Sequence, residues 1–322
     1  MENWFFLNTT YPIPILCLVG PTASGKTELS IILAQKFGKS ELIYADSMAI
    51  YKYLNIGTAK PTKEQRSLIP HHLIDLLEPD QTWSSFRFRA EAFRRIYECL
   101  ERHAFPIIVG GTGFYLKSLY EPFVAQGSPC HQRLRLILER YSNTQLFASL
   151  VTIDPPRASQ IGKNDRKRLI RALEIYHQTG KPPSTFKKMT SKSRNPFQFI
   201  LIGIEYERED LKRRISERTQ FMIKQGLVQE TQDILLKGFS PKIPALKNFT
   251  YTPVIHYLQG KLTLQQMEKQ ITIGTFQYLK RQSTWFRKAP VYWISPKGKN
   301  FDIISDEIMQ IYCMNAKRRS VL

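Results

Sequence analysis

The stretch "IPILCLVGPTASGKTELSIILAQKFG", residues 13–38, decides the fold. Its apolar beginning, residues 13–19, predicts a buried β-strand, and its end predicts a helix that Gly38 terminates. Between them, "GPTASGKT" has the spacing of a phosphate-binding loop: glycine, four residues, then Gly-Lys-Ser/Thr. Such a loop at a helix N-terminus presents backbone N–H groups to an anion. The sequence therefore predicts an α/β domain that binds phosphate groups.

The alternation of strands and helices continues along the chain. "LIYA", residues 42–45, predicts a second short strand, and a helix with Phe93, Ile96 and Leu100 on its apolar side leads to the strand "PIIVGG". This alternation predicts a parallel sheet with covering helices. A strand "VYWIS" and a loose basic tail, "NAKRRSVL", are expected near the C-terminus.

Residues 121–199 differ in composition from the rest of the chain. They read as polar helices and carry 14 Lys+Arg against 5 Asp+Glu, a net charge of +9, before "FILIGI" (199–204) returns as a buried strand. We therefore expect a P-loop core in two parts, 1–120 and 200–322, with a basic helical insertion at 121–199. The second part of the core is expected to be mostly helical.

The whole chain is strongly basic, with 47 Lys+Arg against 27 Asp+Glu and a formal net charge of +20. Such an excess favours a polyanionic partner, and nucleic acid is preferred because no basic amphipathic membrane anchor stands out. The helix "NDRKRLIRALEIYHQTG" of the insertion is expected to turn Arg166, Lys167 and Arg171 toward this partner. A merely solvated charged face is the alternative.

Other features bear on the environment of the protein. The apolar runs are far shorter than the roughly 18–20 residues that span a bilayer, and "MENWFFLNTT" lacks the basic lead of a secretory signal. A membrane span is excluded and a cytoplasmic protein is expected. The four cysteines are far apart and have no histidines at ligand spacing, which favours reduced thiols over a zinc site or disulfides. They are Cys17, Cys99, Cys130 and Cys313.

The phosphate-binding loop supplies three kinds of group. Its backbone N–H groups form a concave anion site, Lys26 adds positive charge at the terminal phosphates, and the Thr27 hydroxyl suits Mg²⁺. The residues expected to bind the phosphates are Gly20, Pro21, Thr22, Ala23, Ser24, Gly25, Lys26 and Thr27.

Other strand ends and one helix contribute further candidates. Asp46 follows the second strand and faces the same crevice, either as a base or as a turn or helix cap. The strand "PIIVGG" leads to Thr112 and not to the acidic metal ligand that is usual in nucleotide hydrolases. Arg214 and Arg218 fall on the apolar stripe of a predicted helix. A buried guanidinium needs a partner, which is either a protein carboxylate or a bound anion.

Several of these stretches together resemble the tRNA dimethylallyltransferase family over nearly the whole chain. They are "GPTASGKT", "ADSMAIYK", "NIGTAKP", "IVGGTGFYLKSL", "RLIRALE" and "LKRQSTWFR", in the family's order and spacing. The resemblance implies a nucleotide-kinase-like P-loop sheet with a helical insertion. It also implies transfer of a dimethylallyl group from dimethylallyl diphosphate to the exocyclic amine of the adenine 3′ to the anticodon in tRNA, with release of diphosphate.

The resemblance implies roles for individual residues. The loop would hold the diphosphate with Mg²⁺, Asp46 would be the base, Thr112 would orient the adenine amine, and Lys26 and Arg218 would stabilise the departing diphosphate. A monomer is expected. Contacts with tRNA are implied for Asp46, Ser47, Met48, Ala49, Thr112, Lys167, Arg168, Arg171 and Lys247.

The sequence departs from the family pattern at three places. "KNFTYTPV" (247–254) keeps Lys247 and Tyr251 but has Thr250 for a glycine and Thr252 for a basic residue. Arg87 stands where an acidic residue is common, and Phe276 stands where an arginine is common. These departures concern RNA contacts more than catalysis.

Two other functions compete with the prenyltransferase. A P-loop kinase for a nucleotide or small molecule explains Lys26 and Thr27, but it does not explain the +9 insertion. An RNA-binding protein with a vestigial loop is disfavoured by the intact Lys26, Thr27, Asp46 and Thr112.

Overall fold

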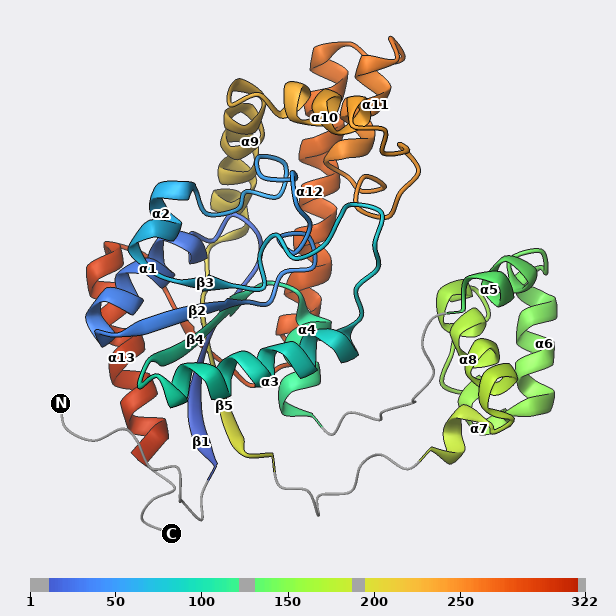
Figure 1. The fold of residues 1–322 in the computed structure, drawn as a ribbon, viewed down its shortest axis with the longest axis horizontal. Helices are drawn as coiled ribbons and strands as arrows, with labels where there is room; N and C mark the ends of the chain where they lie inside the picture. The colour runs from blue at the N-terminus through green and yellow to red at the C-terminus, as the bar shows by residue number, and fades with distance from the viewer. Residues whose placement is uncertain (1–11, 122–130, 187–194, 318–322) are drawn as a thin grey trace. The chain divides into compact units, whose positions relative to one another are not determined.

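The computed structural model describes residues 12–121, 131–186 and 195–317. The chain divides into two compact units, Met1–Tyr120 with Asn195–Leu322 as one and Glu121–Arg194 as the other (Figure 1). The first unit contains a six-stranded sheet. The described part of the second unit consists of helices joined by short turns.

The sheet of the larger unit is parallel throughout, as the alternating pattern predicts. Its order is β3-β2-β4-β1-β5-β6, and each neighbouring pair runs in the same direction. The predicted α/β fold is confirmed. The strands are β1 (Ile13–Val19), β2 (Ser40–Tyr44), β3 (His71–His72), β4 (Phe105–Gly110), β5 (Phe197–Ile204) and β6 (Val291–Ile294).

Helices cover both faces of this sheet (Figure 1). On one face, α1 (Lys26–Phe37) and α13 (Phe301–Lys317) pack Leu29 and Ile304 into one core. On the other face, α3 (Ser85–Glu101), α4 (Gly113–Tyr120) and α12 (Leu264–Phe286) contribute Ile96, Leu116 and Phe286 to a second core. The remaining helices of this unit are α2 (Lys63–Leu68), α9 (Arg208–Lys224), α10 (Leu227–Leu236) and α11 (Tyr251–Leu258).

The C-terminal end differs from the sequence prediction. The expected loose tail "NAKRRSVL" begins inside α13, whose last three residues are Asn315, Ala316 and Lys317; residues 318–322 lie outside the described part. Helix α13 is fixed because Ile304, Ile308 and Tyr312 are buried against the sheet. The strand β5 also begins two residues earlier than predicted, at Phe197.

The smaller unit has a core of its own. Its helices are α5 (Gln132–Leu138), α6 (Asn143–Ile153), α7 (Pro155–Ala158) and α8 (Arg166–Thr179), followed by a short 3₁₀ turn, Pro183–Thr185. Leu146, Leu150, Leu169 and Leu173 form the centre of this core. Asp154 links α7 to the 3₁₀ turn, because its carboxylate accepts hydrogen bonds from the backbone N–H groups of Arg157 and Ser184.

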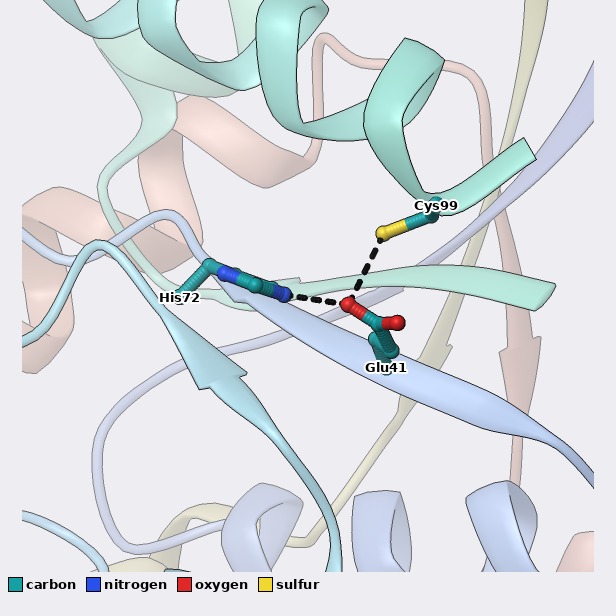
Figure 2. A group of neighbouring side chains, drawn as sticks. All are labelled: Glu41, His72 and Cys99. Atoms are coloured by element: carbon teal, nitrogen blue, oxygen red, sulfur yellow. Dashed lines mark hydrogen bonds and ion pairs between the residues drawn. The ribbon is translucent and has the colours of Figure 1, made fainter. Parts of the chain in front are cut away.

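A polar cluster joins β2, β3 and α3 at one edge of the sheet (Figure 2). One oxygen of Glu41, Oε2, lies 2.5 Å from His72 Nε2 and accepts from the Cys99 thiol at 3.3 Å. Arg102 also donates to this carboxylate, at 2.8 and 3.2 Å. Residues 41, 72 and 99 meet only through the fold, so spacing along the chain does not reveal them.

We assign this cluster a structural role. Arg102 neutralises Glu41, and burial raises the pKa of Cys99 to about 12, so the thiol is a hydrogen-bond donor at neutral pH. Cys17, Cys99 and Cys313 are free thiols, as expected, and Cys130 lies outside the described residues. Burial alone would raise the pKa of Glu41, but hydrogen bonds from Arg102, His72 and Cys99 outweigh it and lower the pKa to about 2.

We predict that Glu41→Gln lowers stability at pH 7 and flattens its pH dependence in acid. A carboxylate whose folded pKa is depressed stabilises the protein above its unfolded pKa, and this contribution is lost as the pH falls from about 5 toward about 2. The shift corresponds to about 3 kcal/mol at pH 7. Urea unfolding of both proteins between pH 7 and pH 3 tests this. Equal pH slopes for the two proteins would contradict it.

Candidate active site

The predicted phosphate-binding loop connects β1 to α1. Gly20 and Gly25 have φ of 147° and 78°, and Ala23 has φ of 63°, so three residues of the loop have positive φ. The Ser24 hydroxyl donates to the Pro21 carbonyl at 2.8 Å and stabilises the turn. A Cβ on Gly25 would lie 2.6 Å from the Phe301 ring, so only glycine fits at this position without displacing that ring.

Lys26 is folded back over this loop. Its Nζ donates to the Pro21 carbonyl at 2.5 Å and to Ser24 Oγ at 3.3 Å. Burial lowers the pKa of Lys26 to about 7, and the charge of Arg218 adds to the shift while Asp46 opposes it. An anion that enters the loop would therefore stabilise the charged form of Lys26 and raise this pKa.

A cavity of about 700 Å³ opens over the loop and brings the main predicted residues together. Thr22 to Thr27, Asp46 and Arg218 line it, with Gly110 and Gly111 from the end of β4. These groups come from the carboxyl ends of three neighbouring parallel strands, β1, β2 and β4, and from α9. This is the place where α/β sheets bind ligands.

Asp46 has the capping role, which is one of the two roles that the sequence left open, and the role of base stays a prediction. Its Oδ1 accepts hydrogen bonds from the N–H groups of Met48 and Ala49 at 2.7 and 3.1 Å, so it caps the turn after β2. Within the described residues, Oδ2 makes no such bond, and Asp46 lines the cavity. The cap fixes the carboxylate, since a group held by two backbone N–H groups has little freedom to rotate.

Thr112 is tied to the same turn. Its hydroxyl accepts the Ser47 N–H at 3.1 Å, and its own N–H donates to the Ala45 carbonyl at 3.2 Å. The ends of β2 and β4 are thus joined directly. A Cβ on Gly110 would lie 2.2 Å from the Ala45 carbonyl oxygen, so the two strand ends approach each other too closely for any other residue there.

The two arginines of α9 serve different purposes. Arg214 donates from Nε to the Ala23 carbonyl at 2.8 Å and lies over the Tyr206 ring, so it supports the loop at the wall of the cavity. Arg218 lines the same cavity, and burial lowers its pKa. Among residues 12–121, 131–186 and 195–317, no carboxylate forms an ion pair with Arg218. Of the two predicted partners, a bound anion fits better.

The sequence did not single out two cavity residues on α12. Gln282 accepts the Thr22 N–H at 2.9 Å and donates to the Gly111 carbonyl at 2.9 Å, which bridges the loop and the end of β4. Tyr278 lines the same cavity and stacks on Phe249, and burial, followed by the charge of Asp46, raises its pKa to about 12. Gln282 lies within the motif "LKRQSTWFR", but the motif alone did not indicate what this residue contacts.

Only some of the basic side chains predicted to face a partner are exposed on the insertion. Lys167 and Arg168 are exposed, as expected. Arg166 instead donates to the carbonyls of Glu139 and Tyr141 and to the Asn143 side chain, so it joins α8 to the turn between α5 and α6. The expectation that Arg166 is free to face a partner is wrong.

Arg171 differs from the prediction for a similar reason. It donates to Glu174 at 2.7 Å, and Arg135 forms a second ion pair with the same carboxylate at 3.0 Å. Glu174 is fully buried, and a buried carboxylate requires such partners. Arg171 is therefore already paired within the unit, but part of its side chain reaches the surface, and its contact with tRNA stays a prediction.

The segment "KNFTYTPV" divides into exposed and buried parts. Lys247 is exposed. Tyr251, the first residue of α11, is fully buried and donates its hydroxyl to Glu230 at 2.7 Å. The Thr252 hydroxyl donates to the Leu246 carbonyl. At the other departures from the family pattern, Arg87 lies over the Trp83 ring, and Lys280 lies over the Phe276 ring.

Comparison with known proteins identifies the family. The model of the family described as IPP transferase matches residues 49–289. The chain belongs to the IPP transferase family. Within the described residues, no helix is long and apolar enough to cross a membrane.

Relatives and solved structures agree with this membership. The chain is 41% identical over 302 residues to a tRNA dimethylallyltransferase of Pelotomaculum thermopropionicum, covering 92% of this chain and 95% of the relative. It is 41% identical over 286 residues to another from Acetivibrio thermocellus, covering 87% and 91%. A tRNA isopentenylpyrophosphate transferase of Staphylococcus epidermidis is similar in structure, with a TM-score of 0.68, 36% identity and coverage of 93% and 98%.

We predict that binding of inorganic diphosphate takes up a proton at Lys26 and weakens as the pH rises above about 7. Without a bound anion, Lys26 has a pKa of about 7. A bound anion favours the ammonium form, so the affinity is highest at a pH where Lys26 is already charged. Calorimetry between pH 6.5 and 8.5, in buffers of different ionisation enthalpy, measures the uptake.

Lys26→Ala is the control for this experiment, because the ligand itself titrates in the same range. The difference in pH slope between wild type and variant isolates the contribution of Lys26. An identical slope in both proteins would show that Lys26 keeps one protonation state throughout.

Proposed function

We propose that this protein transfers a dimethylallyl group from dimethylallyl diphosphate to the exocyclic amine of the adenine 3′ to the anticodon in tRNA. The observation that carries this proposal is one cavity that brings together the predicted phosphate-binding loop, the Asp46 residue and Arg218, which has no ion pair within the described part of the chain. The named relatives support it, and they include a eukaryotic dimethylallyltransferase described as acting on tRNA, with a TM-score of 0.73 and 28% identity.

Asp46 acts as the base in this mechanism. An exocyclic adenine amine is a weak nucleophile because its lone pair is delocalised into the ring, and removal of its proton by a positioned base typically contributes about 100- to 10,000-fold. The carboxylate is held by Met48 and Ala49 through Oδ1, which leaves Oδ2 to accept the proton. Thr112, tied to Ser47, orients the amine.

The leaving diphosphate gains charge as the allylic carbon–oxygen bond breaks. Lys26, Arg218 and the loop N–H groups stabilise this charge in the transition state. Mg²⁺ suits the same position, because it keeps several waters and binds through phosphate oxygens and few protein groups; the Thr27 hydroxyl, which lines the cavity, would hold it. When bound, the ion neutralises part of the diphosphate charge.

A kinase is not favoured. The relatives and structural neighbours named above are prenyltransferases. The end of β4 offers Gly110 and Gly111 to the cavity and not an acidic residue for a nucleotide-bound metal ion. A single chain carries every group used in the mechanism, so a monomer suffices.

We also propose that the insertion, the unit Glu121–Arg194, contacts the tRNA backbone. Lys167 and Arg168 are neighbours at the start of α8, and both are exposed. Contacts of this kind, with phosphates, would offset the few kcal/mol needed to take the target base out of its stack.

The direct test is a transfer assay. The protein is incubated with Mg²⁺, unmodified tRNA and labelled dimethylallyl diphosphate, and in parallel with ATP labelled in its γ-phosphate. Label that enters tRNA only from the prenyl donor supports the proposal. Phosphate transfer from ATP to a small molecule, with no prenyl transfer, would establish the kinase instead.

We predict that Asp46→Asn slows single-turnover transfer by at least about 100-fold, because the amide keeps the shape and cannot accept the proton. The affinity for tRNA should change little. The amide oxygen can still accept from Met48 and Ala49, so the turn is retained and circular dichroism serves as the control. Transfer at a near wild-type rate would leave Asp46 with its capping role alone.

We predict that the double change Lys167→Ala and Arg168→Ala weakens tRNA binding and lowers its salt dependence by about one unit per lost phosphate contact. The rate at saturating tRNA should change much less. The matched control is Arg94→Ala with Arg95→Ala on α3, which removes the same charge from the core unit. Equal effects of both pairs would point to net charge, and not to a contact surface on α8.

A further inference from the structure

The carboxylate of Glu230 lies at the centre of a cluster between α10, α11 and residues 54–60, here called the 54–60 loop. Glu230 Oε2 accepts the N–H groups of Asn55 and Ile56, both at 2.7 Å. Oε1 accepts the Gly57 N–H at 3.0 Å and the Tyr251 hydroxyl at 2.7 Å. Three successive backbone N–H groups that converge on one carboxylate form an anion-binding concavity, filled here by the protein's own side chain.

Packing holds the same loop at the same point. A Cβ on Gly57 would lie 2.5 Å from the Tyr251 hydroxyl oxygen and 2.9 Å from Leu227 Cδ1, so the loop backbone rests directly on these two side chains. Tyr251 and Leu227 are both fully buried. The loop is therefore held by hydrogen bonds and by close packing from α10 and α11 together.

The other end of the loop reaches the active-site cavity. Thr58, Ala59 and Lys60 line the cavity that contains Lys26 and Asp46. Ala59 has φ of 47°, a left-handed conformation that a residue with a Cβ keeps only when its surroundings enforce it. Lys60 Nζ donates to Asp75 Oδ1 at 2.6 Å, a separate ion pair that anchors the end of the loop.

We propose that Glu230 is a positioning residue for the transfer reaction, which together with Tyr251 fixes the 54–60 loop as one wall of the cavity that holds the prenyl donor. Glu230 does not itself line the cavity, and it acts through the N–H groups of Asn55, Ile56 and Gly57. The inference rests on the proposed function, because its main effect is on the donor.

Glu230→Gln is the informative change. A glutamine has one acceptor oxygen, and its NH₂ group cannot accept a hydrogen bond. Some of the four N–H and O–H groups that now donate to Glu230 would therefore lose their acceptor. The variant should raise KM for dimethylallyl diphosphate about tenfold and leave KM for tRNA nearly unchanged. Amide hydrogen exchange in residues 55–57 should become faster, also by about tenfold.

Glu41→Gln is the matched control. Glu41 is a buried carboxylate that, like Glu230, has several hydrogen-bond partners, here His72, Arg102 and Cys99, and it does not line the cavity. The Glu41→Gln variant should lose thermal stability, as Glu230→Gln does. Its KM for dimethylallyl diphosphate and its amide hydrogen exchange at residues 55–57 should stay at wild-type values. If Glu230→Gln lowers the melting temperature and leaves donor KM and loop exchange unchanged, the positioning role is overturned.

A second variant and a second binding measurement complete the test. If Glu230→Gln does not fold, Tyr251→Phe, which removes only the hydroxyl, should produce smaller changes in the same direction, and wild-type values in that variant overturn the proposal. If the wild-type protein transfers no prenyl group, the proposed function fails by itself. The loop is then tested by the affinity for inorganic diphosphate, which Glu230→Gln should weaken and Glu41→Gln should not.

Discussion

The crowding of positive charge around the phosphate-binding loop is the constraint on which the site depends. Burial lowers the pKa of both Lys26 and Arg218, and Arg218 lowers that of Lys26 further. Asp46 is the carboxylate whose charge opposes both shifts, and its Oδ1 already accepts two backbone hydrogen bonds. The lining of the cavity holds four cationic side chains, Lys26, Lys60, Arg214 and Arg218, against three carboxylates, Glu28, Asp46 and Glu217, and a bound diphosphate would neutralise the excess of positive charge. Supports such as Gln282 and Arg214 keep the loop open for that ligand.

The parts of this site that the sequence predicted are those with local causes. Glycine spacing and a following helix define the loop, because the backbone conformation at Gly20 and Gly25 depends on those residues themselves. Asp46 and Thr112 were predictable because they follow parallel strands, whose carboxyl ends share one edge of the sheet. The order of strands was not needed for this inference; their common direction was sufficient.

The parts that the sequence did not predict depend on partners far apart in the chain. Gln282 bonds to Thr22 across 260 positions, and Glu230 bonds to Asn55 across 175. A glutamine or glutamate on a helix has no periodic signature that distinguishes such a partner from solvent. Charge counting did not reveal the partners of Arg166 and Arg171 for the same reason, since composition records an excess but not which guanidinium groups are already bound inside the unit.

The divergent segment "KNFTYTPV" shows how a departure from a family pattern is accommodated. Thr250 has φ of −92° and ψ of −57°, a right-handed conformation that any residue adopts, so the glycine expected there is not required by the backbone. Asn248 stabilises the turn by accepting the N–H groups of Thr250 and Tyr251. The retained Tyr251 points inward to Glu230. Tyr251 therefore serves the shape of the cavity, and the charge missing at Thr252 leaves that role intact.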